Sequence, residues 1–331
     1  MTAIDAHAHV IVPELLRDAA PGERWRPSVR RVDSRQVVEL AGRTVSSVSH
    51  EFVELDRILA VEARAGIDRV LLCPWVALLF YDVDAAEGLR RCRLQNQGLA
   101  RLHREHPDRV SVLGAVPLQD PCLAATELEA LMATGIFTGV EVAASVAGSY
   151  LGDPCFEPFW AAAERSRALV FLHPTTRGFS EPAFGEHYLH NLVGNPMETT
   201  LAAAHMVLGG VMERHPGLNV LLAHGGGAIV SLGGRLRRGH EAVAAAGGEL
   251  SEAADRSIRR FLFDSITHDP ALLRALVDAV GADRVLLGSD YPFDMADPDP
   301  VGTVRAAGLG AAEEAALLGG NAERLLALVA G

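Results

Sequence analysis

Lysine is absent from this chain of 331 residues, and all 30 of its basic residues are arginine. The absence excludes chemistries that need a lysine amine: Schiff-base catalysis, pyridoxal-phosphate catalysis and nucleotide binding by a Walker-A loop. It also excludes a metal centre bridged by a carboxylated lysine. Abundant alanine, arginine and glycine indicate a GC-rich genome as the reason, but the exclusions hold whatever the cause.

Other classes are disfavoured by charge and composition. The formal net charge of -12 argues against nucleic acid as a partner, because binding a phosphate backbone needs a basic surface. No apolar run approaches the ~18 residues of a membrane span, and the N-terminus lacks a signal-peptide pattern. The four cysteines form no CxxC pair. We therefore expect a soluble cytoplasmic protein with reduced thiols and no membrane partner.

Short apolar runs alternate with longer amphipathic segments over most of the chain. The predicted strands are Ala3–Val10, Arg69–Cys73, Val110–Ala115, Gly139–Ala143, Leu169–His173, Val220–His224, Phe261–Asp264 and Val285–Ser289. The predicted helices are Glu54–Ala65, Glu87–His106, Ala124–Thr134, Phe156–Arg167, Met197–Arg214 and Pro270–Val280. This alternation predicts an α/β fold, a (β/α)8 TIM barrel, with an open doubly wound sheet as the alternative. The absence of GxGxxG after the first strand lowers the odds of a dinucleotide-binding sheet.

Three segments interrupt or extend the alternation. Ile11–Glu51 is an insertion after strand one, in which Arg35–Glu39 and Arg43–Val48 are predicted to form a hairpin. Pro174–Pro196 is a long loop after strand five, and Val301–Ala330 is predicted to form C-terminal helices. Because there is neither a linker nor a repeat, we expect a single domain over residues 1–331.

Five polar side chains lie at the ends of four predicted strands: His7, His9, His173, His224 and Asp290. The period of two along a strand places both imidazoles of the HxH pair on one face. Alone, that pair is better explained by a structural role. Together, the five side chains indicate a divalent metal such as zinc, which supplies a partner for buried polar groups and leaves a position open for water. Glu141 on strand four is either a bridge to a second metal or, the simpler interpretation, a carboxylate that lies in a polar barrel mouth or faces a helix.

Several motifs give the chain a resemblance to the amidohydrolase superfamily. They are HAHV (His7–Val10), FLHP (Phe171–Pro174), LLAHGGG (Leu221–Gly227) and LLGSDYPF (Leu286–Phe293). More narrowly, the chain resembles the aminocarboxymuconate-semialdehyde decarboxylase group, through LVGNPMETT (Leu192–Thr200), GGVMERHPGLNV (Gly209–Val220) and GNAERLL (Gly320–Leu326).

The resemblance implies a role for each matching residue. His7, His9, His173 and Asp290 are implied as ligands of one divalent metal, usually zinc with manganese as the alternative, and no organic cofactor is expected. His224 is implied beside the metal without binding it. Arg235 is implied to reach the active site of a neighbouring subunit in a homodimer and to pair with a substrate carboxylate. Arg43 matches a second carboxylate-binding arginine, and for both arginines a solvated surface charge is the alternative.

One position departs from the group's pattern. Asn191 stands where the muconate enzyme has a tryptophan in its substrate pocket, so an amide replaces an aromatic wall and the substrate is expected to differ.

We predict a metal-dependent non-oxidative decarboxylase of a small unsaturated or aromatic acid, with arginines holding the carboxylate. Either His224 or Asp290 carries the proton. The alternatives are a hydrolase of a lactone or amide, or a hydratase, on the same barrel, and a non-catalytic metal-binding protein.

Overall fold

Eight parallel strands form one sheet in the order β1-β5-β6-β7-β10-β11-β12-β13. Their bounds are β1 Ile4–Val10, β5 Arg69–Pro74, β6 Val110–Gly114, β7 Phe137–Ala143, β10 Leu169–His173, β11 Asn219–Leu222, β12 Leu262–Asp264 and β13 Val285–Leu286. The sheet closes where the chain after β13 runs beside β1, with the His9 N–H donating to the Tyr291 carbonyl and the Ala6 N–H to the Leu287 carbonyl. This computed structural model, which describes residues 2–16, 23, 25–32, 35–40, 43–47, 51–175, 182–243, 246 and 250–330, confirms the predicted TIM barrel.

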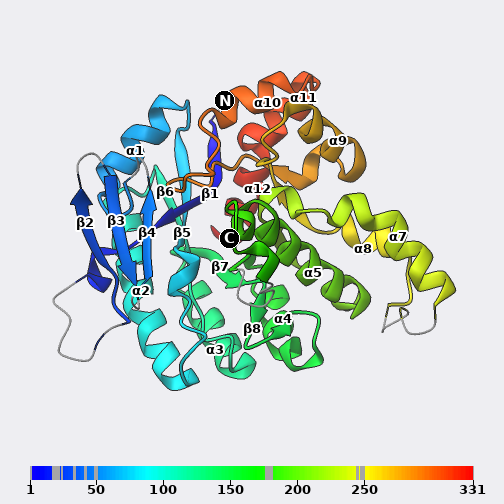
Figure 1. Ribbon diagram of the computed structural model, residues 1–331, viewed down its shortest axis with the longest axis horizontal. Helices are drawn as coiled ribbons and strands as arrows, with labels where there is room; N and C mark the ends of the chain where they lie inside the picture. The colour runs from blue at the N-terminus through cyan, green and yellow to red at the C-terminus, as the bar shows by residue number, and fades with distance from the viewer. Residues whose placement is uncertain are drawn as a thin grey trace.

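Helices follow the strands and cover the outside of the barrel (Figure 1). They are α1 Leu55–Arg64, α2 Ala85–Glu105, α3 Pro121–Met132, α4 Glu157–Arg165, α5 Asn195–Leu208, α6 Val211–Arg214, α7 Ile229–Ala242, α8 Ala254–Ile258 and α9 Pro270–Val280. Asp-Pro pairs begin α3 and α9, where Asp120 and Asp269 accept hydrogen bonds from the first free N–H groups and proline tolerates the first position. Among the described helices, none is both long and apolar enough to span a bilayer.

The insertion after β1 forms a separate antiparallel sheet of β2 Ser28–Val32, β3 Arg35–Leu40 and β4 Arg43–Ser47. The predicted hairpin is confirmed, because β3 and β4 pair antiparallel with Leu40 opposite Arg43. Strand β2 was not anticipated, and it pairs with β3 from Ser28 opposite Glu39. Figure 1 places this sheet at one end of the long axis, beside α1 and α2, whereas α7 and α8 project at the other end.

Some predicted boundaries are wrong. The predicted helix Met197–Arg214 is divided into α5 and α6, because Gly210 adopts a left-handed conformation with φ of 69°. The strand predicted to reach His224 ends at Leu222, because His224 begins a left-handed turn. Helices α7 and α8 were not predicted. The C-terminal segment forms α10 Pro300–Ala306, α11 Ala311–Ala315 and α12 Asn321–Ala330.

A bulge in β1 decides which side chains face the barrel interior. The pairing of β1 with β5 shifts between Asp5 and Ala8. Below the bulge, Ile4 and Ala6 pack in the inner cluster with residues such as Leu71 and Phe171, whereas above it Ala8 packs in the outer cluster beneath the helices. Because the alternation resets at the bulge, His7 and His9 face inward at the C-terminal end of the barrel.

Candidate metal centre

The structure brings four predicted side chains into one buried group: His7, His9, His173 and Asp290. One ligand atom from each lies within 4.8 Å of the others, and all four residues are at most 5% exposed. They come from β1, from the end of β10 and from the segment after β13, at the barrel face where such folds place active sites.

Each imidazole is oriented by a hydrogen bond from its Nδ1 atom. His7 Nδ1 lies 2.7 Å from Asp264 Oδ2, His9 Nδ1 lies 2.9 Å from the Pro74 carbonyl, and His173 Nδ1 lies 2.8 Å from the Pro174 carbonyl. Since a carbonyl or carboxylate oxygen only accepts, each Nδ1 is the protonated nitrogen. All three Nε2 atoms are therefore left with a lone pair for a common ligand.

The Nε2 side of the group is short of hydrogen-bond partners. His7 Nε2 lies 3.0 Å from His9 Nε2, so when both imidazoles are neutral two lone pairs face each other. His173 Nε2 and Asp290 Oδ1 are buried and have no hydrogen bond among the described residues, although Asp290 Oδ1 lies 3.2 Å from His7 Nε2. Buried polar atoms without partners are costly, and one divalent cation would satisfy all of them. The donor set therefore fits a single metal ion.

The pKa values of the group show the same demand for positive charge. Burial alone would lower the pKa of His7, but the carboxylates of Asp290 and Asp264 outweigh it and raise that pKa to about 10. Burial lowers the pKa of His9 and brings that of His173 well below its usual range. Burial would raise the pKa of Asp290, yet the surrounding imidazoles hold it well below its usual range. The charged Asp290 thus requires a cation, either a proton on His7 or a metal.

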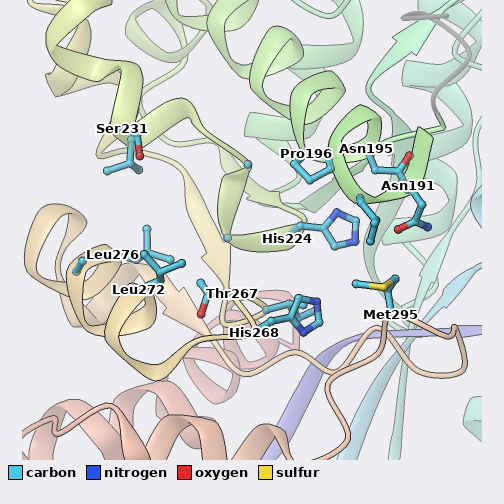
Figure 2. A pocket seen from close by; sticks show the side chains of 16 residues that line it. Asn191, Asn195, Pro196, His224, Ser231, Thr267, His268, Leu272, Leu276 and Met295 are labelled. Carbon is cyan, nitrogen blue, oxygen red and sulfur yellow. The ribbon is translucent and has the colours of Figure 1, made fainter. Parts of the chain in front are cut away.

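His224 lies next to this group but outside it. Its Nε2 atom is 3.5 Å from Asp290 Oδ2, and its side chain is 15% exposed. It opens onto a cavity of about 360 Å³ lined by residues that follow β10, β11 and β12, among them Asn191, Asn195 and His268. Figure 2 shows the imidazoles of His224 and His268 on the same side of the cavity as Asn191 and Met295, with Leu272 and Leu276 at the other end.

The roles of the two predicted arginines stay predictions. Arg235 is exposed on α7, and no arginine is among the described residues that line the cavity. Arg43 begins β4, but its side chain lies outside the described residues. Asn191 does line the cavity, from the π-helical turn η5 His190–Gly194 that precedes α5.

Glu141 is buried on the inner face of β7, and neither of its carboxylate oxygens has a hydrogen bond among the described residues. Burial raises its pKa well above the usual range, which favours the neutral acid. Its oxygens are not part of the buried group formed by the three histidines and Asp290. The geometry supports the simpler interpretation of this residue over a bridge between two metals.

Sequence reasoning missed Asp264, which accepts the hydrogen bond from His7 and also contacts the backbone of His224. The signal was present, because Asp264 closes a predicted strand just as His173 does. The strand-end criterion that selected the histidines would also have selected this carboxylate.

Comparison with known proteins shows the family of this chain. The family model described as amidohydrolase matches residues 4–328. The chain belongs to the amidohydrolase family. It is 28% identical over 330 residues to a 2-amino-3-carboxymuconate-6-semialdehyde decarboxylase of Dictyostelium discoideum, covering 98% of this chain and 91% of the relative.

Solved structures of amidohydrolase-type decarboxylases share the fold. The 5-carboxyvanillate decarboxylase of Sphingomonas paucimobilis superposes with a TM-score of 0.83 at 25% identity, covering 98% of this chain and 99% of that one. A dihydroxybenzoic acid decarboxylase from Polaromonas sp. JS666, solved with manganese and 2-nitroresorcinol, has a TM-score of 0.79 at 21% identity, covering 99% and 97%. The second likeness is one of fold alone.

Proposed function

We propose that this amidohydrolase-family protein is a metal-dependent, non-oxidative decarboxylase of a small unsaturated or aromatic carboxylic acid. The observation that carries the proposal is the buried group of three imidazoles and one carboxylate, with His224 between it and a cavity of about 360 Å³. That volume lies in the range of small-molecule sites. The similarity to decarboxylases over nearly the whole chain supports a carboxy-lyase.

His7, His9, His173 and Asp290 are the proposed ligands of one divalent ion. Three imidazole nitrogens and a carboxylate oxygen suit zinc, and manganese is the alternative. When bound, the ion supplies Lewis-acid polarisation of a substrate carboxylate, hydroxyl or carbonyl oxygen. No organic cofactor is part of the proposal.

His224 is the proposed proton carrier. Loss of carbon dioxide leaves the electron pair of the broken C–C bond on the substrate carbon that carried the carboxylate, and this carbon must then receive a proton. The His224 imidazole faces the cavity and is 3.5 Å from Asp290, so its Nε2 can hold a proton at the cavity wall and release it to a bound substrate. Asp290 itself is the alternative donor, through the Oδ2 atom nearest His224.

The cavity wall favours a substrate with polar substituents on an apolar framework. Asn191 and Asn195 offer amides that both donate and accept, while Leu272, Leu276 and Met295 offer apolar surface. An amide at position 191 can bind a hydroxyl or carbonyl group, which supports a substrate other than the muconate semialdehyde. We retain Arg43 as a candidate partner of the substrate carboxylate.

The chain is proposed to act as a homodimer in which Arg235 of one subunit completes the cavity of the other. Its exposed position on α7 supports this, as does the lack of an arginine among the described cavity residues of its own chain. We further propose one domain over residues 1–331 and a cytoplasmic location. The four free cysteines are compatible with a reducing compartment.

The reaction is tested by incubating the protein with a panel of aromatic and muconate-type acids. We expect release of carbon dioxide from at least one acid, loss of activity after chelation, and recovery with zinc or manganese. Reactions run in 18-O water separate the alternatives: a new labelled carboxylate indicates a hydrolase and an added labelled hydroxyl a hydratase. Either labelled product without carbon dioxide would contradict the decarboxylase.

The role of Arg235 is tested by complementation. Arg235→Ala and His224→Ala homodimers are each expected to be nearly inactive, because each of their sites lacks one group. Coexpression of the two variants should restore about a quarter of wild-type activity, since half of the dimers are mixed and each carries one intact site. Arg238→Ala, at another exposed arginine of α7, is the control and should keep full activity. No recovery in isolated mixed dimers would contradict a contribution between subunits.

A further inference from the structure

The turn that carries His224 has an unusual backbone. His224, Gly225, Gly226 and Gly227 follow one another with φ values of 57°, 61°, 73° and 61°. A side chain is excluded at two of these glycines, because a Cβ atom would lie 2.7 Å from the Phe263 ring at Gly226 and 2.1 Å from the Pro196 carbonyl oxygen at Gly227. This explains why the sequence reads HGGG. It does not explain what holds His224, a residue with a Cβ, in a left-handed conformation that costs energy.

The Asp264 carboxylate holds His224 in this conformation. The carboxylate is fully buried at the end of β12 and accepts four hydrogen bonds. Oδ2 accepts from the His224 N–H at 2.8 Å, and Oδ1 accepts from the Gly225 N–H at 2.7 Å and from the Ile266 N–H at 3.1 Å. Consecutive N–H groups in such turns form a concave site for an anion. Here that anion is part of the protein.

The same carboxylate also orients a proposed metal ligand. Asp264 Oδ2 lies 2.7 Å from His7 Nδ1 and accepts a hydrogen bond from it, so that Nε2, beside His9 and Asp290, is the nitrogen available to a metal. One side chain therefore contacts both halves of the site, the ligand on β1 and the turn after β11.

We propose that Asp264 is a positioning residue that couples the two: it sets the tautomer in which His7 binds metal and it holds the turn that presents His224. This inference rests on the proposed metal site and extends it to a residue that touches neither metal nor substrate. It assigns a specific consequence to the charge of Asp264, beyond the stability that any buried hydrogen bond contributes.

Asp264→Asn separates the two explanations because the shape is kept and one acceptor becomes a donor. If the NH2 of the new asparagine faces His7, the His7 Nδ1 atom must accept a hydrogen bond instead of donating one. The imidazole proton then moves to Nε2, and His7 no longer binds metal. If the amide group faces Gly225 and Ile266, two N–H donors oppose it and the His224 turn is lost. In the first orientation the His224 N–H also loses its acceptor, so in either orientation the variant loses at least one of the two functions.

The measurement is a titration of the metal-free, full-length protein with cobalt(II), followed by absorption, together with competition by zinc. We expect metal affinity of Asp264→Asn to fall by about 10–100-fold, or turnover at saturating metal to fall by a similar factor. Asp297→Asn is the matched control, because Asp297 is also buried, and its carboxylate accepts from the Asp299 N–H and the Thr303 hydroxyl rather than from a proposed metal ligand or the His224 turn. Its metal affinity should stay within about 3-fold of wild type.

The outcomes are distinct. An Asp264→Asn protein that melts at a lower temperature but binds metal and turns over normally would overturn the proposal. If the variant does not fold, nitrogen-15 NMR of histidine-labelled, zinc-loaded wild type decides: a strongly deshielded His7 Nδ1 proton is expected, and its absence overturns the role. Wild type that binds no metal overturns the metal site and this role together, whereas wild type that binds metal but releases no carbon dioxide overturns only the proposed reaction.

Discussion

Replacing His224 with alanine is expected to lower turnover by about 10²–10⁴-fold while the protein still binds its metal. The imidazole is the proposed proton carrier, and removing it leaves the substrate carbon that lost its carboxylate without a positioned proton donor. His224 is not part of the buried group of His7, His9, His173 and Asp290, so all four proposed ligands are present in the variant. The measurement is carbon dioxide release at saturating substrate, with metal content determined on the same sample.

His106→Ala is the matched control, because His106 lies at the end of α2 and is paired only loosely with the exposed Asp56 at 3.5 Å. It should retain wild-type turnover. If His224→Ala keeps a near-normal rate with metal bound, His224 is not the proton carrier and Asp290 takes its place. If the variant loses metal as well, His224 belongs to the ligand set.

The His173→Ala variant is expected to lose both metal and activity. His173 supplies one of three imidazole ligands, and its Nε2 atom has no other partner among the described residues. The remaining hydrogen bond, from Nδ1 to the Pro174 carbonyl, is a local contact. Metal content after dialysis should therefore fall to background, and carbon dioxide release should fall below detection.

Thermal unfolding separates lost metal binding from lost folding. Metal that binds the folded chain raises its melting temperature by an amount that grows with the ratio of free metal to its Kd. Addition of zinc or manganese should raise the melting temperature of wild type and of His106→Ala, but not that of His173→Ala. Metal-free samples of all three should melt at similar temperatures. A normal metal-dependent rise in His173→Ala would show that His173 is not a ligand.

Most of the barrel could be predicted from the sequence because its signals are local. Apolar runs such as Val220–Leu222 mark strands buried on both faces, and Asp-Pro pairs mark helix starts. The predicted strand Leu169–His173 has the bounds of β10, and the predicted helix Pro270–Val280 has the bounds of α9. The ends of helices were harder to predict. A single glycine, Gly210, divides α5 from α6, and its conformation depends on packing as well as on residue type.

For the site too, the identities of the residues could be predicted from the sequence, whereas their orientations could not. Residue type and strand-end position, both readable along the chain, selected five metal-competent groups, and the family resemblance set one of them apart from the ligands: His7, His9, His173, Asp290 and, beside the metal, His224. No local pattern states that the alternation of β1 resets between Asp5 and Ala8, and without that bulge both β1 histidines would face the helices. Nor does any pattern link Asp264 to His7, which lies 257 residues away.

The sequence by itself determined which chemical groups this protein has, including the absence of lysine that leaves imidazoles and carboxylates to hold a metal. Only the tertiary structure decided their directions. Orientation depends on hydrogen bonds between strands that are distant in the chain, such as those of Asp264 to His7 and to the His224 turn. Such bonds form only when the barrel closes, because closure brings the ends of β1, β11 and β12 to one face.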